Sequence, residues 1–485
     1  MGFAFVPLYI KYLGIEAYGL IGLFAVLQAW LALLDMGLTP TLSREMARLT
    51  GGEHSAVSIR DLLRSVEVVA LIVAVLMAGA IALISTWLAS TWVRAENLDG
   101  HVVAKAFAIM GVVAALRFVE GIYRSSLVGL QQQVMFNVIN SGMATLRSLG
   151  AVVVLAWMSP TILAFFVWQG LGSVLTLALL ALATYARLPR SERSGRFSLE
   201  TLRKVWRFAG GMTGITFLAL LLTQVDKILL SKLLSLSDYG YYTLAAAVAG
   251  ILLMLITPIT QAWFPRLSQL QAVDDTDAFV HSYHQGAQLI SVTLGSAAIV
   301  LIMFSEVFLQ LWTQDIVLAQ RAARLLSLLA LGNLLNGLMW IPYQAQLAYG
   351  WTGLTVRINI VAVLIIVPAI LWATSRYGAE GAAWAWVSLN AGYVFFGIHF
   401  MCRRILLKEK WRWYIQDTIQ PLLASAVVGV GVRWIMSPSI GLYEQLAWLL
   451  FASILTFTAA GFAAEQVRRD IILFLNRMAL FRLKK

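Results

Sequence analysis

The chain has 485 residues, of which 60% are hydrophobic and only 12% are charged, and its net charge is +12. A soluble protein is nearer half apolar and a quarter charged, so this composition excludes a soluble globular domain and predicts a membrane protein. The single cysteine, Cys402, excludes an internal disulfide. The closest histidine pair, His281 and His284, lies beside aspartates expected in a solvated loop, so we predict neither a metal nor a cofactor.

Hydrophobic runs divide the chain into segments that can cross a membrane, which takes about 20 apolar residues. About 14 transmembrane segments are predicted: 1–10, 18–36, 66–90, 104–129, 134–157, 160–186, 208–232, 241–264, 285–311, 322–349, 352–375, 378–402, 416–436 and 445–465. The first is half the length of a span and lacks the features of a signal peptide, so we expect a truncated first helix. The predicted fold class is an all-α polytopic membrane protein.

Lysine and arginine gather on one side of the predicted membrane. The connections after even-numbered segments, together with the C-terminal tail, hold 23 of these residues, whereas the opposite side holds 6. Cytoplasmic loops are enriched in Lys and Arg, so we expect both termini in the cytoplasm. The positive charge then reflects topology and contact with anionic lipid heads, and we expect no nucleic-acid partner. Seven basic residues remain inside the segments, namely Arg117, Arg124, Arg147, Lys227, Arg324, Arg357 and Arg433.

The two halves of the chain resemble each other at an offset of 221 or 222 residues. The matched positions are Tyr18-Gly19 with Tyr239-Gly240, Gly129 with Gly350, Asn137 with Asn359, and Arg44 with Arg266. This pattern indicates a duplication of six plus six helices that enter the membrane from the same side. The predicted organisation is an N-terminal six-helix lobe (1–186), a basic cytoplasmic linker (187–207), a C-terminal six-helix lobe (208–402), and two further helices with a basic tail (403–485).

Several predicted helices carry polar side chains along one face, whereas a helix surrounded by lipid should be apolar all round. The polar positions are Arg117, Glu120 and Arg124 on segment 104–129, Asn137, Asn140 and Arg147 on segment 134–157, and Asn333, Asn336, Trp340 and Tyr343 on segment 322–349. One interpretation is hydrogen bonding between helices, worth roughly 0.6 kcal/mol per pair. Glu120 and Arg124, four residues apart, can also neutralise each other. However, a mid-membrane arginine needs a buried partner or a wet cavity, which favours a substrate cavity for Arg117 and Arg147.

Segment 208–232 contains two adjacent charges, Asp226 and Lys227. Neighbouring residues on a helix point about 100° apart, so we do not expect these two to pair easily. Inside the segments, basic residues outnumber acidic ones, which suits an anionic headgroup such as a phosphate, a pyrophosphate or an acidic sugar. Arginine binds such oxygens through two parallel hydrogen bonds, and aromatic residues such as Trp340 can stack on sugar rings.

No sequence motif for catalysis is present. The chain has no P-loop, no G-x-S-x-G and no H-E-x-x-H, and its predicted outer loops are short. These observations favour a transporter over an enzyme.

The stretch Tyr12–Leu49 resembles polysaccharide flippases of the Wzx/PST type, in the multidrug/oligosaccharidyl-lipid/polysaccharide exporter superfamily. Members carry Tyr-Gly after the first helix and an acidic-x-Gly pair that closes the second helix, followed by an arginine. The matching positions here are Tyr18-Gly19, Asp35-x-Gly37 and Arg44, while Gln224–Ala245 resembles the seventh helix and Gly129–Asn137 the connection between the fourth and fifth.

The resemblance implies two six-helix bundles in a V around a central cavity, plus a C-terminal helix pair. It implies a flippase that moves an undecaprenyl-diphosphate-linked oligosaccharide across the bacterial cytoplasmic (inner) membrane by alternating access, for O-antigen or exopolysaccharide biosynthesis. The expected partners are the lipid-linked oligosaccharide, membrane lipids, and a polysaccharide polymerase and chain-length regulator. Asp35, Arg44, Asp226 and Lys227 are candidates for gating or coupling. A lipid II flippase, a cation-coupled multidrug exporter and a non-transporting assembly scaffold remain alternatives.

Overall fold

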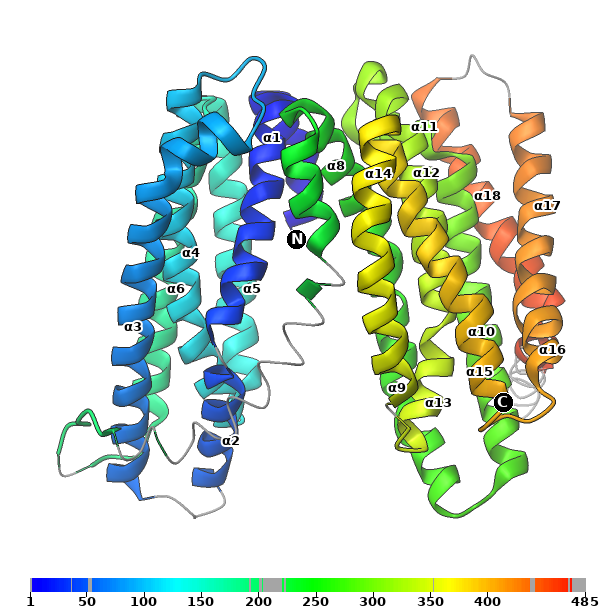
Figure 1. Cartoon of the computed structure of the whole chain (residues 1–485), viewed down its shortest axis with the longest axis horizontal. Coiled ribbons are helices and arrows are strands. Elements are labelled where there is room, and N and C mark those ends of the chain that lie inside the picture. Colours follow the sequence, from blue (N-terminus) through cyan, green and yellow to red (C-terminus); the bar gives the residue numbers. More distant parts are fainter. Residues whose placement is uncertain are drawn as a thin grey trace, which may run out of the picture. The chain divides into compact units, whose positions relative to one another are not determined.

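A computed structural model of the chain describes residues 2–35, 37–50, 55–191, 193–199, 203, 220–221, 224–351, 353–436, 441–469 and 472. These residues are predominantly helical and contain no β-strand (Figure 1). Within them, eleven helical runs are long and apolar enough to cross a membrane. The predicted all-α polytopic fold is confirmed. The count of 14 segments stays a prediction, because segment 208–232 lies largely outside the described residues.

Two of the eleven runs each contain two predicted segments. The run Phe3–Asp35 includes α1 (Val6–Leu31), which is broken at Gly14, where φ is 80°. The run Gly353–Cys402 includes α14 (Gly353–Gly392), which is broken at Gly378, where φ is 60°. Only glycine adopts a positive φ without steric cost, so each glycine permits an abrupt change of direction. We refer to residues 353–377 as the first arm of α14, and to residues 378–402, which continue beyond the end of α14 through α15 (Ile398–Cys402), as its second arm.

The chain divides into two compact units, Met1–Gly240 and Tyr241–Lys485. The long helices of unit 1 are α1, α2 (Leu38–Thr50), α3 (Ala56–Trp87), α4 (Gly100–Gly129), α5 (Gln133–Val153) and α6 (Ile162–Arg187). Leu42 and Met46 of α2 pack with Leu63 of α3 and Ile122 of α4 in one buried cluster. This cluster fixes α2 against the ends of α3 and α4.

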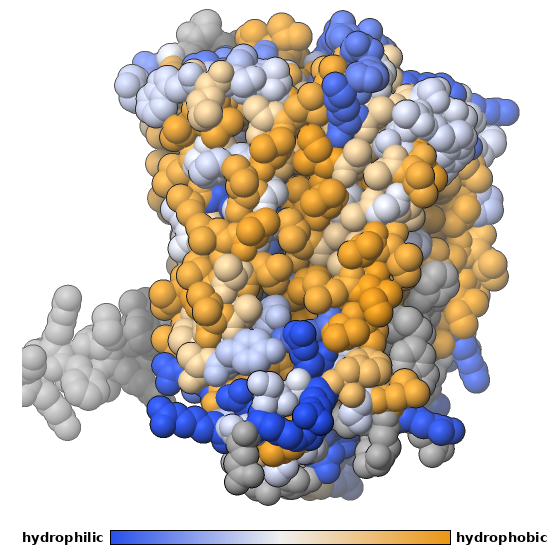
Figure 2. Space-filling view, turned by 90° about the vertical axis from the view of Figure 1, so that its left-hand side faces the viewer, coloured by the Kyte–Doolittle hydropathy of each residue, from blue (hydrophilic) through white to orange (hydrophobic). Residues whose placement is uncertain are grey.

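The outward face of α3 is apolar over several turns, with Leu71, Val75, Leu76 and Leu83 exposed. Figure 2 shows a broad hydrophobic belt on this side of unit 1, bounded above and below by hydrophilic residues. This is the distribution expected for a surface in contact with lipid. Helix α3 begins at Ala56, ten residues before the predicted segment, so Arg60 and Arg64 lie on its first turns and not in a loop.

The helices of unit 2 follow one another along the chain with short connections. They are α8 (Leu236–Met254, which starts in unit 1), α9 (Ile256–Ala272), α10 (Thr276–Met303), α11 (Ser305–Thr313), α12 (Ile316–Leu338), α13 (Trp340–Ala348), α14, α15 (Ile398–Cys402), α16 (Lys410–Arg412), α17 (Gln420–Ile435) and α18 (Leu442–Ala463). The central helix is α10, whose Tyr283, Ile290 and Leu294 lie in the largest buried cluster of this unit. Helices α17 and α18 both pack against α10.

Several helices start at side-chain caps that the sequence supplies. Ser55, Asp99 and Thr161 accept hydrogen bonds from backbone N–H groups at the starts of α3, α4 and α6. Asp275 and Asp315 do the same for α10 and α12. Such caps satisfy backbone donors that would otherwise lack partners, at about 1 kcal/mol each. Asp275, expected in a solvated loop, therefore has a structural role.

The described part of the predicted linker folds back onto α3. Arg193 forms an ion pair of 2.6 Å with Asp61, and the backbone N–H of Arg196 donates to the same carboxylate at 2.7 Å. Arg60 donates to the carbonyl oxygen of Pro189 at 3.1 Å. The predicted boundaries 1–186, 187–207, 208–402 and 403–485 stay predictions, since part of the linker lies outside the described residues.

The repeated Tyr-Gly motifs meet in unit 1, where α1 crosses the start of α8. A Cβ atom on Gly19 would lie 2.6 Å from the carbonyl oxygen of Leu236, and a Cβ atom on Gly240 would collide with the carbonyl oxygen of Ile15. Ile15 and Leu236, like Gly19 and Gly240, are 221 residues apart. The contact is therefore reciprocal between repeat-related positions, which supports the duplication inferred from the sequence.

Candidate functional site

Unit 1 contains a polar cavity of about 480 Å³ between α1, α4, α5 and α6. We call it the charged cavity. Five of the six cavity candidates predicted in this half line it, namely Arg117, Glu120, Arg124, Asn140 and Arg147. The three arginines and one glutamate give this lining a net charge of +2.

Arg117 is held in place by amide and hydroxyl groups. Its Nη1 donates to Oε1 of Gln28 and its Nη2 donates to Oε1 of Gln169, both at 2.9 Å. Its Nε lies 3.4 Å from the hydroxyl of Ser173, and its guanidinium stacks 5.1 Å above the ring of Phe24. Most of the N–H donors of Arg117 are therefore already used. Its side chain contributes positive charge to the cavity and keeps its protein partners.

Arg147 has a different environment. Its Nη1 lies 3.9 Å from Oε2 of Glu120, which is longer than a hydrogen bond, and both side chains are more than 80% buried, with 14% and 13% of their surface exposed. The aliphatic stem of Arg147 passes over Gly172, where a Cβ atom would collide with it. Glu120 Oε1 is buried and has no hydrogen-bond partner within the described residues. The guanidinium of Arg147 therefore retains donors directed at the cavity.

The expected pairing of Glu120 with Arg124 is wrong. Glu120 faces Arg147 on the neighbouring helix α5, whereas the exposed Arg124 stacks 5.9 Å from the ring of Phe136. The i, i+4 spacing permits a pair but does not require one, and burial favours the contact with Arg147. Asn137 is exposed on α5 outside the cavity lining.

In unit 2, two of the predicted polar residues are used between helices. Asn333 donates to the carbonyl oxygen of Ala249 at 2.9 Å and accepts from the indole of Trp386 at 3.0 Å. Asn336 donates to Oδ1 of Asn390 at 2.8 Å. These bonds are the helix–helix contacts considered as the alternative interpretation of the sequence.

Asn336, Trp340 and Tyr343 also line a pocket of about 260 Å³ in unit 2, whose surface is mostly apolar but carries amide and hydroxyl groups. For these groups we call it the polar pocket. Trp340 and Tyr343 meet edge to face at 6.4 Å, and Thr355 and Asn359 contribute polar groups to the lining from the first arm of α14. An aromatic pair beside hydroxyl and amide groups is chemically suited to a sugar.

The candidate gating residues of unit 1 lie around α2. Asp35 accepts from the backbone N–H of Thr39 at 3.1 Å and from its hydroxyl. It therefore caps the first turn of α2, and Gly37 between them has φ of 75°. Arg44 lies on α2. These positions explain the acidic-x-Gly pattern as the start of a helix.

Asp226 and Lys227 lie on the helical stretch 224–233. They were not expected to pair easily, and their contact is long: Lys227 Nζ lies 4.0 Å from Asp226 Oδ1. The long side chain of lysine spans the angle between adjacent positions. Lys227 Nζ also donates to Oε1 of Gln224 at 3.4 Å, and Asp226 and Lys227 are both partly exposed, at 21% and 29%.

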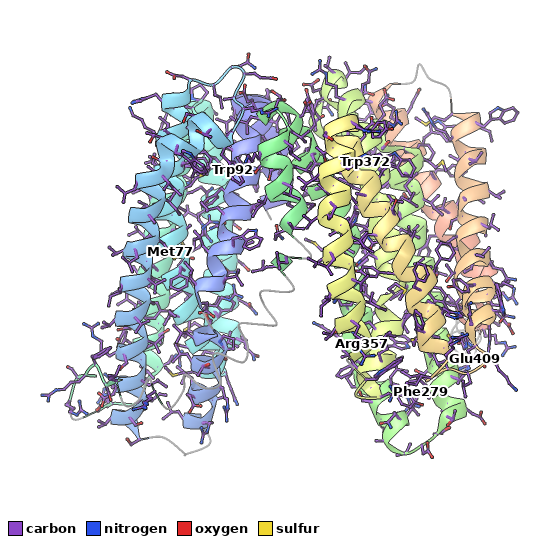
Figure 3. All side chains as sticks on the ribbon, viewed as in Figure 1. Met77, Trp92, Phe279, Arg357, Trp372 and Glu409 are labelled. Atoms are coloured by element: carbon purple, nitrogen blue, oxygen red, sulfur yellow. The ribbon has the colours of Figure 1, made fainter. Side chains whose placement is uncertain are left out.

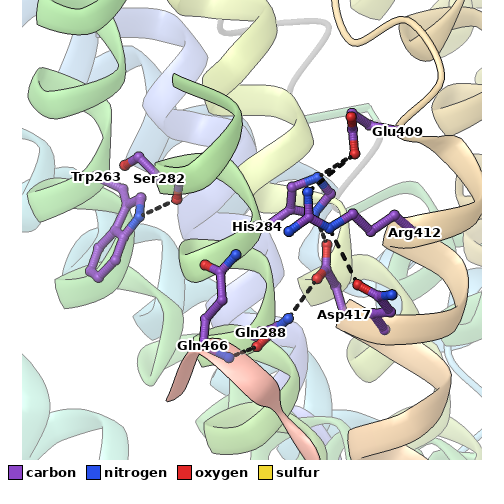
Figure 4. Close-up of polar contacts among 9 residues, drawn as sticks. Trp263, Ser282, His284, Gln288, Glu409, Arg412, Asp417 and Gln466 are labelled. Carbon is purple, nitrogen blue, oxygen red and sulfur yellow. Dashed lines mark hydrogen bonds and ion pairs between the residues drawn. The ribbon is translucent and has the colours of Figure 1, made fainter. Parts of the chain in front are cut away.

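A buried polar network joins α10 to the residues between α15 and α17 (Figure 4). His284, fully buried, contacts Asp417 through Nδ1 and Glu409 through Nε2, the latter at 2.9 Å. Gln288 donates to the other oxygen of Asp417 at 2.9 Å and accepts from the backbone N–H of Gln466. Both ring nitrogens of His284 are thus occupied by protein partners, whereas His281 is exposed.

Several residues that hold these polar groups are not among those predicted from the sequence. Gln28 and Gln169, which accept hydrogen bonds from Arg117, are single amides in apolar runs. An isolated polar residue in such a run is the only feature of the sequence that marks them as buried hydrogen-bond partners. Asp417 lies in the predicted segment 416–436 and is buried, but it is not among the predicted site residues. A buried aspartate needs a hydrogen-bonded or charged partner, and the structure supplies His284 as that partner.

The fold is that of a known class of polytopic transporters. The structure of the lipid II flippase MurJ in an inward closed conformation aligns with a TM-score of 0.67 at 13% identity, over 97% of this chain and 98% of that one. An inward-facing multidrug resistance MATE family transporter of the MOP superfamily aligns with a TM-score of 0.63 at 14% identity, over 83% and 93%. At these identities the similarity establishes the fold alone.

The family follows from the sequence. The family described as polysaccharide biosynthesis protein matches residues 1–271, more than half of the chain, and the chain belongs to this family. A second family, described as MatE, matches residues 213–372. The predicted resemblance to the polysaccharide branch of the superfamily is therefore confirmed.

Two relatives carry names that refer to O-antigen and to lipopolysaccharide. A protein of Shigella flexneri, named as an O-antigen transporter, is 21% identical over 376 residues, which cover 77% of this chain and 87% of the relative. The lipopolysaccharide biosynthesis protein WzxC of Escherichia coli strain K12 is 22% identical over 235 residues, which cover 47% of this chain and 46% of the relative.

Proposed function

We propose that this protein is a flippase for an undecaprenyl-diphosphate-linked oligosaccharide, which it moves from the cytoplasmic to the outer leaflet for surface polysaccharide biosynthesis. Family membership, and a relative named as an O-antigen transporter, support a polysaccharide precursor as the cargo. The observation that carries the proposal is the charged cavity, where a buried arginine, Arg147, has donors directed at open space beside a net positive lining.

The charged cavity suits the diphosphate of such a substrate. Arg147 can offer two parallel N–H donors to phosphate oxygens, and its 3.9 Å contact with Glu120 is weak enough to exchange. Arg117, fixed by two glutamines, adds positive charge without moving. The exposed Asn140 extends the lining toward neutral hydroxyl groups of a sugar.

Transport by alternating access requires contacts that open and close. We assign this role to the crossing of Gly19 and Gly240 and to the partly exposed pair Asp226–Lys227, with Asp35 and Arg44 around α2 as supporting positions. Neutralising Asp226 with Asp226→Asn should slow transport several-fold while the protein still inserts. Transport at the wild-type rate would remove Asp226 from this role.

The remaining assignments follow from the same proposal. The chain is expected in the cytoplasmic (inner) membrane with both termini in the cytoplasm, where 23 of its Lys and Arg residues then lie. It acts without a cofactor or an enzymatic step. A polysaccharide polymerase and a chain-length regulator are proposed partners, since the flipped repeat unit is material for polymerisation.

A deletion strain tests the proposal directly. Its lipid-linked intermediates should accumulate as intact repeat units on the cytoplasmic leaflet, and the plasmid-borne chain should release them. Purified protein in proteoliposomes should then move the same intermediate to the opposite leaflet. Accumulation of lipid II, or a changed drug sensitivity without accumulation, would replace the proposal with a lipid II flippase or a drug exporter. Complementation in cells without flipping by the purified protein would indicate a scaffold.

A further inference from the structure

A long apolar groove lies along α14 in unit 2. Its volume is about 1010 Å³, and it is lined almost entirely by the two arms of α14. Small residues, Ala362, Ala369 and Ala385, are buried or half-buried in its lining, between larger side chains such as Ile365, Trp384 and Phe396 that are more exposed. Small residues thus lie at the bottom of the groove and bulky side chains lie along its sides. Unlike the exposed apolar face of α3, this groove can enclose the hydrocarbon chain of a lipid.

The two ends of the groove differ in charge. Arg324 and Glu380 form an ion pair of 3.1 Å at one end. Arg357, exposed at the other end, has no ion pair or hydrogen bond within the described residues. Arg357 and Trp372 mark opposite ends of the first arm in Figure 3. The unpaired charge therefore lies at the end of the groove that we predict to be cytoplasmic.

The groove continues into the polar pocket. Ile358 and Tyr393 line both of them, and the hydroxyl of Tyr393 donates to Asn359 at 3.4 Å in the wall between them. Arg357 is adjacent to this junction in the sequence. The continuous surface thus has an apolar groove, then the positive charge of Arg357, then amide, hydroxyl and aromatic groups. This order matches an amphiphile with a long hydrocarbon chain and an anionic, polar head.

The length of the groove distinguishes between lipid types. Arg357 and Trp372 are fifteen residues apart on one helix arm, about 22 Å at 1.5 Å per residue. One leaflet of a hydrocarbon core of about 30 Å supplies only about 15 Å. A chain that follows the groove from Arg357 thus passes the midplane of the bilayer, which suits a polyprenyl chain better than an acyl chain confined to one leaflet.

We propose that this groove binds the polyprenyl chain of the lipid-linked oligosaccharide, with the phosphate nearest the lipid beside Arg357. The inference rests on the proposed flippase function and adds a loading site for the lipid part of its substrate. The charged cavity of unit 1 receives the headgroup in a later step, after it has left Arg357.

Photolabelling of the full-length protein in nanodiscs tests this site. The probe is undecaprenyl diphosphate carrying a diazirine in its chain, with phosphatidylglycerol or unlabelled undecaprenyl phosphate as competitor. We expect labelled peptides from both arms of α14, and competition by undecaprenyl phosphate at concentrations at which phosphatidylglycerol has no effect.

Paired variants locate the contacts. Ala369→Phe fills the groove and should reduce labelling at least five-fold, whereas Leu364→Phe, at a lipid-facing position outside the lining, should leave it unchanged. Arg357→Gln should reduce labelling several-fold, whereas Arg403→Gln, an exposed arginine just beyond α15 and outside the lining, should not.

The outcomes separate this inference from the proposed function. If the wild-type protein flips the lipid-linked oligosaccharide but labelling is spread over α3, α14 and α17 alike, or is displaced equally by phosphatidylglycerol, the groove holds ordinary bilayer lipid and the inference is overturned. Equal labelling of the wild-type protein and both groove variants would also overturn it. If the wild-type protein neither flips the substrate nor binds the probe, the proposed function fails together with the inference.

Discussion

The charged cavity of unit 1 and the apolar groove of unit 2 occupy corresponding positions of the two sequence repeats. At the offset of 222 residues, Asn140 corresponds to Ala362 and Arg147 to Ala369. The first member of each pair lines the cavity of about 480 Å³, and the second lines the groove of about 1010 Å³. One half of the duplication therefore carries charge where the other carries small apolar residues.

The same contrast holds one helix earlier. Arg117, Glu120 and Arg124 of α4 correspond, at the offset of 221, to Leu338, Ile341 and Ala345. Those three are core residues of unit 2, with 4%, 0% and 0% of their surface exposed. Duplication thus accounts for the helices, while the side chains have diverged into one half suited to a polar head and one suited to a lipid chain.

The largest effect on transport is expected from a substitution that gives the apolar groove the positive charge found at the corresponding position of the cavity. Ala369→Arg places an arginine at the position that corresponds to Arg147, but the nearest acid in the groove lining, Glu380, is already paired with Arg324. An unpaired arginine at membrane depth costs about 2.5–3.5 kcal/mol on insertion scales. We expect transport to fall to background in the leaflet assay, together with lower membrane levels.

The neutral comparison is Ala369→Met, which adds a long side chain at the same position without a charge. It should lose less transport per molecule than Ala369→Arg. Equal activity of the arginine variant and the wild-type protein would show that the groove tolerates a cation, and the contrast between the halves would then have no functional meaning.

The next largest effect is expected from removing the charge of the cavity itself. Arg147→Ala should reduce transport at least ten-fold, because the donors directed at the cavity are lost, and Arg147→Lys should be intermediate since lysine cannot form two parallel hydrogen bonds. Arg187→Ala removes the same charge from an exposed position outside the cavity lining and should change transport less than two-fold. Initial flipping rates, normalised to membrane protein, measure all three. A loss that follows protein level alone would make Arg147 structural.

A third prediction concerns the place where the repeats remain alike. Gly19→Val adds atoms where even a Cβ would lie 2.6 Å from the carbonyl oxygen of Leu236, so α1 and α8 must separate, at a cost of about 1–3 kcal/mol. We expect a several-fold loss of transport and a lower unfolding temperature. Gly79→Val on α3, where nothing lies within 4 Å of an added Cβ, is the control. Normal transport by Gly19→Val would show that the crossing need not close.

The sequence was sufficient for the membrane fold and for much of the charged cavity. Hydropathy predicted the helices, and helical spacing placed Arg117 and Arg147 on polar faces of their helices, which the structure brings together in one cavity. It was insufficient for partners across helices, because spacing within one helix favoured Glu120–Arg124 while packing of α4 on α5 selects Glu120–Arg147. The apolar groove had no sequence signal of its own, since alanines on a lipid-facing helix look the same whether the surface is convex or hollow.

The smallest expected effect concerns how the cavity is held. Gln169→Leu removes one acceptor of Arg117 and leaves a buried donor unsatisfied, which costs about 1–3 kcal/mol. Thermal unfolding of the purified protein in detergent should register this loss, whereas transport per folded molecule should fall no more than about two-fold, because Arg147 is untouched. Gln133→Leu, at an exposed position of α5, is the control for the change in residue type. If Gln169→Leu instead abolishes transport without lowering stability, Arg117 contacts the substrate directly and shares the role assigned to Arg147.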